Sequence, residues 1–457
     1  MRRVRGDAGG SLDIRAGYHR VMAGPKRIYL DNAATSFPKP EGVLAAMVEY
    51  ATEIGASPGR GSYAESLRGA EVLSRCRERL CELFGGSSPE HVIFTLNCTD
   101  ALNLAIHGLV KGAQRREPGK HRGAGFPARE NGRIHIVTTA MEHNSVLRPC
   151  QELLGEHGGR EVRPTGSSHG GRDARPTGSV EITRVPADSE GFIDPAAIAA
   201  AILPETCLVA IVHASNVTGT LQDIAAVGEV CRSRGVPMLV DAAQSLGHVP
   251  IDVEAMGIDL LAFPGHKGLM GPLGTGGLYI RPGLEDLIEP VRQGGTGSRS
   301  ESDQQPRDLP DRYEAGSHNT LGIAGLLAGV EWLLERGVEA IRKHEFELMA
   351  EFFTCFPGEA SGYRLLGPGG LAGRVGVFAI THDRLSPARL AGELEQRAGV
   401  LCRAGLHCAP GVHETMGTIG TGGACRLSVG PFISKADVRT ACGCLGKITE
   451  MALDTVK

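Results

Sequence analysis

The chain has 457 residues, a formal net charge of -4 and 41% hydrophobic residues, which is enough apolar sequence for a large core in two or three domains. No apolar run reaches the roughly 18 residues of a membrane span, and the near-neutral charge argues against nucleic acid or an anionic membrane as partner. The 12 cysteines are scattered and follow no secretory signal, so we expect reduced thiols and a cytoplasmic protein.

The first structured segment is expected at residue 28. Residues 1–27 begin basic and contain no apolar core segment, so we expect a disordered tail. A short strand over 28–30 and a turn lead to a helix that ends near Ile54. A second helix is predicted over Ala64–Phe84, where leucines and a cysteine form one stripe and glycines follow.

Short apolar runs and helical segments then alternate, which is typical of an α/β fold with a mainly parallel sheet. The expected helices begin near residues 100, 144 and 224. The expected strands cover 91–95, 134–139, 207–213, 236–241, 259–263 and 278–280. We assign residues 28–310 to one large domain.

Two segments interrupt this alternation. Residues 112–132 are rich in glycine and arginine, and residues 163–179 contain the pentapeptide Arg-Pro-Thr-Gly-Ser twice. Neither segment has apolar periodicity that could offset the entropy of ordering it, so we predict mobile surface inserts. Their arginines could contact an anionic partner, although a solvated loop is the simpler interpretation.

The pattern changes in residues 311–457, which we predict to be a small C-terminal domain. A long helix over Thr320–Arg336 leads into it. The remaining expected elements are a strand over 375–380, a helix over 387–398, a cysteine-bearing loop over 403–411, a strand over 424–429 and a closing helix over 434–451.

One lysine stands out as a candidate nucleophile. Lys267 lies in a glycine-rich loop between the apolar runs 260–263 and 278–280, beside His266. Burial there would lower the pKa of the amine and allow it to form a Schiff base. The alternative is a solvated lysine on an ordinary surface loop.

Further polar residues follow expected strands, at the edge where such sheets bind ligands. Asp241 could pair with a pyridinium nitrogen, or it could cap the next helix. Thr99 begins a helix suited to a phosphate. His143 could lie over a pyridine ring and Asn216 could bond its phenolic oxygen, although each residue type is also common at helix starts and turns. No CxxC pair or spaced Cys/His set occurs, so we expect no metal site.

Taken together, these motifs resemble the cysteine desulfurase and selenocysteine lyase family, whose members have the class V aminotransferase fold. The similarity covers about residues 28–451, apart from the two inserts. It rests on Tyr29-Leu-Asp-Asn-Ala-Ala-Thr35, Glu142-His143-Asn144, Ser215-Asn216-Val-Thr-Gly-Thr220, Asp241-Ala-Ala-Gln244, Gly265-His266-Lys267, Gly294-Gly-Thr296, Glu314-Ala-Gly316 and Arg403-Ala-Gly-Leu-His407-Cys408-Ala.

The resemblance implies a pyridoxal 5'-phosphate (PLP)-dependent transferase of fold type I. Its large domain would contain a mainly parallel seven-stranded sheet, and its small domain would be α+β. The implied enzyme is a homodimer that converts L-cysteine to L-alanine and delivers sulfur for iron–sulfur cluster assembly or another use, to an acceptor protein that the sequence does not identify. Selenocysteine lyase, aminotransferase, epimerase and β-lyase activities remain alternatives, as does a catalytically idle scaffold.

The resemblance also implies a role for each matched residue. Lys267 would bind the cofactor covalently, Asp241 would pair with its ring nitrogen and His143 would stack on the ring. Gln244 and Asn216 would contact its phenolic oxygen. The implied phosphate ligands are Cys98, Thr99 and His266, with Thr296 contributed by the other subunit. Cys408 would carry the persulfide, and the implied substrate-binding residues are Arg426, Arg403 and Asn32.

Two features of the sequence bear on these roles. A cysteine beside Arg403 and His407 would lie in electropositive surroundings, which lower a thiol pKa. A guanidinium such as that of Arg426 could hold a substrate carboxylate bidentately. Many relatives have Ser or Thr before Gly-His-Lys, whereas this chain has Pro264, which cannot donate a hydrogen bond to a phosphate.

Overall fold

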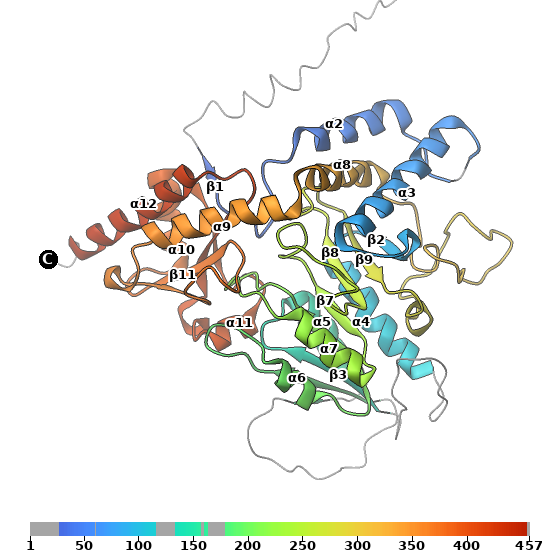
Figure 1. The fold of residues 1–457 in the computed structure, drawn as a ribbon, viewed down its shortest axis with the longest axis horizontal. Coiled ribbons are helices and arrows are strands. Elements are labelled where there is room, and N and C mark those ends of the chain that lie inside the picture. Colours follow the sequence, from blue (N-terminus) through green and yellow to red (C-terminus); the bar gives the residue numbers. More distant parts are fainter. Residues whose placement is uncertain (1–26, 60, 116–132, 157–159, 163–178, 455–457) are drawn as a thin grey trace, which may run out of the picture.

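The structure is a computed structural model that describes residues 27–59, 61–115, 133–156, 160–162 and 179–454. These residues form a large α/β part and a smaller α+β part (Figure 1). The predicted N-terminal tail, except for its last residue, and most of both predicted inserts lie outside the described residues. None of the helices in the described ranges is long and apolar enough to cross a membrane.

The large part is built on an eight-stranded sheet. Only β9 runs opposite to the other strands, so the prediction of a mainly parallel sheet is confirmed. The sheet has one strand more than the predicted seven, because the three-residue β4 pairs with β5 at one edge. In sheet order the strands are β2 (Val92–Thr95), β9 (Gly276–Ile280), β8 (Leu260–Pro264), β7 (Met238–Asp241), β6 (Thr206–Val212), β3 (Ile134–Thr139), β5 (Val180–Val185) and β4 (Arg160–Val162).

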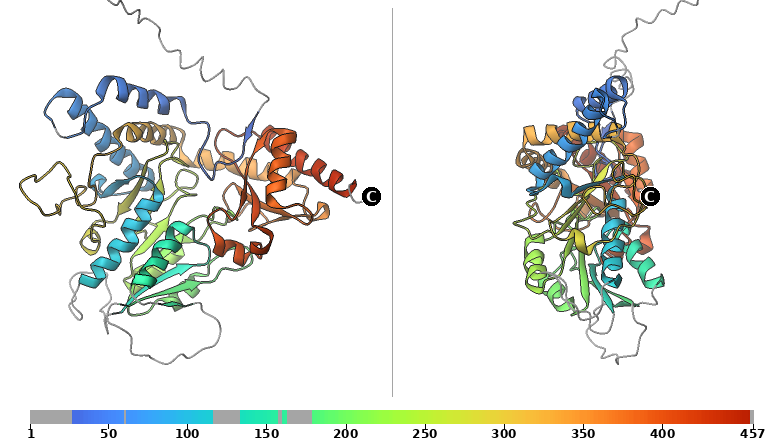
Figure 2. Two further views of the ribbon diagram at one scale, coloured as in Figure 1. Left: turned by 180° about the vertical axis from the view of Figure 1, so that it is seen from behind. Right: turned by 90° about the vertical axis from the view of Figure 1, so that its right-hand side faces the viewer.

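Both faces of this sheet are covered by helices. Alternate residues of a strand belong to different cores: Val209 and Ile211 of β6 pack on one side, and Leu208 and Ala210 on the other. The side view in Figure 2 shows α4 (cyan) and α7 (green) on opposite sides of the sheet. The covering helices are α3 (Ala64–Phe84), α7 (Ile224–Arg234) and α8 (Thr320–Arg336) on the first side, and α4 (Cys98–Arg115) and α5 (Asn144–Glu156) on the second.

The smaller part is an antiparallel sheet packed against helices around its own core. Its strands are, in order, β10 (Tyr363–Leu365), β11 (Val377–His382), β14 (Ala424–Ser428) and β13 (Arg403–Gly405). Its helices are α9 (Val338–Cys355), α10 (Pro387–Ala398), the short α11 (Pro410–Thr415) and α12 (Lys435–Asp454). The first strand, β1 (Ile28–Tyr29), pairs with β12 (Val400–Leu401) of this part. Two further helices lie in the large part, α2 (Glu41–Glu49) and α6 (Pro195–Ala201).

The boundary between the two parts lies later than the predicted residue 310. Ile323, Leu326 and Val330 of α8 belong to the core of the large part, whereas α9 contributes to the core of the small part. The turn between them contains Gly337, whose φ of 80° ends α8. Because Ile341 of α9 still belongs to the core of the large part, packing places the change from one core to the other within α9, after residue 341.

The first predicted insert also begins later than expected. Residues 112–115 are the last turn of α4 rather than part of a loop. A Cβ added to Gly112 would lie 1.9 Å from the Leu287 carbonyl oxygen, so this glycine allows α4 to approach that backbone closely. The glycine content that suggested a loop here serves helix packing instead.

Candidate active site

Lys267 and Asp241 lie at the carboxyl ends of neighbouring parallel strands. Asp241 is the last residue of β7 and only 2% exposed, and Lys267 follows the end of β8. Burial lowers the pKa of Lys267, an effect that the Asp241 carboxylate opposes. The Lys267 amine therefore loses its proton more readily than a solvated lysine, as a nucleophilic amine requires.

The loop that carries Lys267 is fastened to the segment after β1. The Ser36 hydroxyl donates to the Lys267 carbonyl at 2.9 Å, and the Lys39 ammonium donates to the His266 carbonyl at 2.8 Å. Burial lowers the pKa of Lys39 to about 8. Neither residue was predicted from the sequence, although Ser36 follows the 29–35 motif directly and Lys39 lies four residues after it.

One cavity brings most of the predicted cofactor residues together. It lies at the carboxyl edge of the sheet, where parallel α/β sheets bind ligands. Its lining includes Lys267, Asp241, Cys98, Thr99, His143, Asn216, Gln244, His266 and Pro264. Residues from five separate parts of the sequence therefore meet as the motif pattern predicted.

His143 is oriented by a chain of hydroxyl groups. Its Nδ1 accepts from the Ser145 backbone amide at 3.1 Å and lies 2.8 Å from the Ser145 hydroxyl, which lies 2.7 Å from the Thr99 hydroxyl. Burial lowers the pKa of His143 to about 4, so the ring is neutral and Nε2 carries its proton. Ser145 was not predicted as a site residue, although it follows the Glu142–Asn144 motif directly.

The side chain of Cys98 contacts Asp241. Its thiol is 3.5 Å from Asp241 Oδ1, which also accepts from the Ala243 backbone amide. Burial raises the pKa of Cys98, so the thiol keeps its proton and can donate to the carboxylate. Cys98 also begins α4, and both Cys98 and Thr99 at this helix start line the cavity; a helix N-terminus is suited to bind a phosphate.

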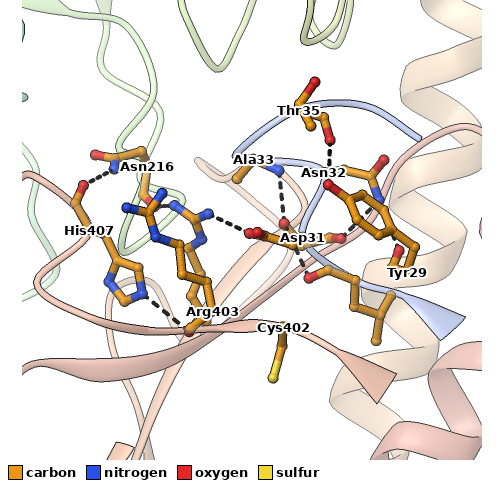
Figure 3. A network of polar contacts seen from close by, with 12 residues as sticks. Tyr29, Asp31, Asn32, Ala33, Thr35, Asn216, Cys402, Arg403 and His407 are labelled. Atoms are coloured by element: carbon orange, nitrogen blue, oxygen red, sulfur yellow. Dashed lines mark hydrogen bonds and ion pairs between the residues drawn. The ribbon is translucent and has the colours of Figure 1, made fainter. Parts of the chain in front are cut away.

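Arg426 is buried in a polar network that joins both parts of the molecule. Its guanidinium donates to Asp31 Oδ1 at 2.6 Å and to the Asn216 carbonyl at 3.1 Å, while its Nε has no partner among the described residues. Figure 3 shows Asn216 and Asp31 on either side of this network, with Arg403 nearby. Arg403 is exposed and sits opposite Arg426 in the β13–β14 register.

Gln244 and Asn32 hold backbone groups in place. The Gln244 side chain donates to the Ala33 carbonyl at 2.8 Å. The Asn32 amide donates to the Tyr29 and Ser428 carbonyls at 3.1 and 3.2 Å, and its oxygen accepts from the Phe37 amide. In the structure, Asn32 therefore holds the backbone of residues 29–37 against β14. Its contact with substrate stays a prediction.

Cys408 lies in a groove that shares part of its lining with the Lys267 cavity. It is exposed and lines an open groove of about 790 Å³ together with Thr99, His143 and Ser145, which also line the Lys267 cavity. The Asn144 amide donates to the Cys408 carbonyl at 2.8 Å, and the Asn216 side chain donates to the His407 carbonyl at 2.7 Å (Figure 3). The cysteine loop therefore rests on two strand-end segments of the large part.

Comparison with known proteins identifies the family. The family model described as aminotransferase class-V matches residues 28–177 and 172–440. The chain belongs to the class V aminotransferase family. A probable cysteine desulfurase from Methanothermobacter thermautotrophicus is 32% identical over 415 residues, which cover 90% of this chain and 92% of that protein. A cysteine desulfurase of Yersinia pestis is 31% identical over 363 residues, or 79% of each chain.

A solved structure supports the same assignment. The apo structure of cysteine desulfurase from Thermococcus onnurineus superposes with a TM-score of 0.79 at 29% identity, covering 93% of this chain and 95% of that one. Within the class V aminotransferases, the chain thus belongs to the cysteine desulfurase group, and the predicted fold type is confirmed.

One expectation for this class V aminotransferase is wrong. His407 does not supply positive charge to Cys408, because its ring is only 3% exposed and burial lowers its pKa to about 3. Its Nδ1 faces His413, and its Nε2 faces the Arg403 carbonyl.

Thr296 is the one predicted cofactor residue outside the cavity lining. Its hydroxyl lies 3.2 Å from that of Ser298, in the segment between β9 and α8. This placement leaves the predicted contribution from a second subunit untested. In the described part of the chain, no cluster of three His, Cys, Asp or Glu residues could hold a metal ion.

Proposed function

We propose that this protein is a PLP-dependent cysteine desulfurase that converts L-cysteine to L-alanine and leaves the sulfur as a persulfide on Cys408. The observation that carries the proposal is that the Lys267 cavity and the Cys408 groove share Thr99, His143 and Ser145 in their linings. In this proposal the substrate amino group lies near Lys267 and the substrate sulfur lies near Cys408, on either side of these three shared residues.

The residues of the cavity fit the cofactor. Asp241 is a buried carboxylate that suits a protonated pyridine nitrogen, and the buried Nδ1 of His266 has no hydrogen-bond partner among the described residues. Lys267 would bind the cofactor covalently, and the start of α4 at Cys98 and Thr99 would hold its phosphate. When bound, PLP supplies an electron sink for the substrate carbons. Pro264 lines the cavity without offering a hydroxyl.

Arg426 would bind the substrate carboxylate. It is 1% exposed, and its charge is already balanced by Asp31, which keeps the guanidinium in place before substrate arrives. Its Nε, which lacks a partner among the described residues, could donate to a carboxylate. Arg403, exposed on the neighbouring strand, would be the second arginine of the site.

The protein groups then divide the chemistry. The neutral Lys267 amine would take the α-proton of the substrate and later return a proton to carbon. The Cys408 thiolate would attack the substrate sulfur, forming an S–S bond as the C–S bond breaks. The C–S electron pair stays with carbon, which gains a proton to become the methyl group of alanine. The products balance as L-alanine and a Cys408 persulfide.

Further parts of the proposal come from the family. The enzyme would act as a cytoplasmic homodimer in which Thr296 of one subunit reaches the phosphate held by the other. A thiol reductant or an acceptor protein would remove the persulfide sulfur, as in iron–sulfur cluster assembly. Size-exclusion chromatography with light scattering tests the dimer, and a monomer of full activity would contradict it.

The test of the function is product formation. Purified, PLP-loaded protein is incubated with L-cysteine and dithiothreitol, and alanine and sulfide are measured. Equal amounts of both are expected. A protein that binds PLP and acts on L-selenocysteine but not on L-cysteine would instead be a selenocysteine lyase.

A further inference from the structure

Two buried histidines lie directly behind Cys408. His407 precedes the cysteine, and His413 is on α11, which begins two residues after it. Their rings are stacked with centroids 5.6 Å apart, and they are 3% and 0% exposed. Neither ring is part of the lining of the Cys408 groove, so direct contact with substrate does not explain them.

The contacts of the two rings determine which nitrogen of each carries a proton. His407 Nε2 lies 3.3 Å from the Arg403 carbonyl, which can only accept, so Nε2 is protonated. Burial lowers the pKa of His407 to about 3 and of His413 to about 4, so both rings are neutral. His407 Nδ1 is therefore an acceptor, and it faces His413 Nε2 at 3.4 Å. His413 Nε2 must then be the donor toward His407, and its Nδ1 accepts from the Thr418 hydroxyl at 2.7 Å. The His413 ring also makes a hydrogen bond to the backbone of Leu406, in the same cysteine loop.

The hydrogen bonds from Thr418 through His413 to His407 end at a stretch of backbone with an energetically unfavourable conformation. His407 and Cys408 have φ angles of 50° and 58°, in the left-handed region that residues with a Cβ rarely adopt. Two such residues in succession persist only when their surroundings hold them. The His407 and Cys408 carbonyls are held by Asn216 and Asn144, and the His407 ring is held by His413.

We propose that His413 is a positioning residue for Cys408, which acts by donating from Nε2 to His407 Nδ1 and so keeps the left-handed turn that presents the thiol. The claim that His413 affects catalysis rests on the proposed role of Cys408 as sulfur acceptor. The claim that His413 fixes the left-handed turn at His407 and Cys408 does not depend on that role. Thr418 supports this role because its hydrogen bond to His413 Nδ1 selects the tautomer in which Nε2 carries the proton and can donate to His407.

The chain offers variants that separate positioning from stability. His413→Gln places an amide donor near the position of Nε2, whereas His413→Asn places its amide near Nδ1 and removes the donor to His407. His135→Gln is a matched control, because His135 is equally buried between two hydroxyls, those of Thr206 and Thr183, in the large sheet.

The first readout is hydrogen–deuterium exchange of the Asn144 amide in PLP-loaded protein, because this amide is bonded to the Cys408 carbonyl. The second is kcat and KM for alanine formation. We expect His413→Asn to raise Asn144 exchange about tenfold and to lower kcat about 100-fold, the effect of a misplaced reacting group, with little change in KM. His413→Gln should stay within about threefold of wild type in both readouts, and His135→Gln should change neither.

Wild-type exchange and kcat in His413→Asn would overturn the proposal, as would equal impairment of the Gln and Asn variants. If His413→Asn does not fold, Thr418→Val keeps the ring but removes the tautomer lock, and unchanged Asn144 exchange in that variant overturns the proposal. If the wild type forms no alanine, the proposed function fails, and Asn144 exchange alone still decides whether His413 fixes the turn.

Discussion

The backbone amide of Asn144 donates a 2.8 Å hydrogen bond to the carbonyl of Cys408. Asn144 is the first residue of α5 and follows His143, which faces the Lys267 cavity. The cysteine that we propose as sulfur acceptor, in the small part, is thus attached directly to a segment of the large part that lines the Lys267 cavity. If the small part moves relative to the large part, the hydrogen bond between Asn144 and Cys408 must either break or move the start of α5 together with the cysteine loop.

Asp241 should be essential for the electron-sink chemistry. We expect Asp241→Asn to reduce alanine formation by about 100- to 1,000-fold, the range seen when one fixed electrostatic group is removed from an active site. The variant should still bind PLP, with a shifted visible absorbance, because Lys267 is unchanged. The control is Asp259→Asn, at the opposite end of the same strand pair, where Asp259 pairs with Arg281. Equal activity of the two variants would contradict the assignment.

Arg426 should determine substrate affinity. Arg426→Lys keeps the charge but loses the guanidinium fork, so KM for L-cysteine should rise about 10- to 100-fold, the loss of one charged hydrogen bond. Steady-state kinetics measure this effect. Arg439→Lys on α12, where Arg439 pairs with Glu351 at the surface, should leave KM unchanged. An unchanged KM in Arg426→Lys would move the carboxylate site to Arg403.

Glu142 should make stability depend on pH. The carboxyl is fully buried and its Oε2 has no partner among the described residues, and burial raises its pKa to about 8. Folded protein therefore keeps a proton that unfolded protein releases above its ordinary pKa of about 4.3, so this group makes stability fall as pH rises from about 5 to 8. Coulombic effects of Asp241 and Arg184 act on the same carboxyl.

Glu142→Gln should remove this contribution. Its oxygen can still accept from the Thr139 hydroxyl and the Val212 amide, as Glu142 Oε1 does. The variant should match wild type near pH 4 and exceed it in unfolding free energy at pH 8, with a difference that grows by about 1.4 kcal/mol per pH unit. Urea unfolding at several pH values measures this, with Glu65→Gln on the exposed face of α3 as control. A constant difference between Glu142→Gln and wild type would show that Glu142 does not titrate in this range.

Two helical glycines should respond in opposite directions. Gly112→Ala places a methyl group against the Leu287 carbonyl and should destabilise the protein by about 1–3 kcal/mol. Gly155 of α5 has nothing within 4 Å of an added Cβ, so Gly155→Ala should stabilise by about 0.5–1 kcal/mol through helix propensity. Denaturant unfolding of both variants tests the close approach of α4, and a stabilising Gly112→Ala would contradict it.

The sequence predicted much of the fold because several of its helices are rich in apolar residues and are followed by a glycine. Predicted and observed bounds coincide for α3, α8 and α10, each of which ends at a glycine. The sequence did not predict α9, because the apolar residues of this helix are divided between the cores of the large and the small part. It also did not predict β4, whose three residues are too few to show a periodic pattern.

The candidate site was predicted in its residue types but not in its contacts. Strand ends placed Lys267, Asp241, His143 and Asn216 in one cavity, because parallel strands bring their carboxyl ends to one edge. Charge could not be predicted in the same way: His407 next to a cysteine suggested a cation, but burial against His413 makes it neutral. Contacts such as Cys98 to Asp241 join residues 143 positions apart and follow no local pattern.

The most direct test of the central claim compares wild type with Cys408→Ala for alanine and sulfide release from L-cysteine in the presence of a reductant. We predict equal amounts of both products from wild type and nearly complete loss in Cys408→Ala, with the PLP absorbance of the variant unchanged because Lys267 and Asp241 remain. Undiminished alanine and sulfide formation by Cys408→Ala would contradict the assignment of Cys408 as the sulfur acceptor.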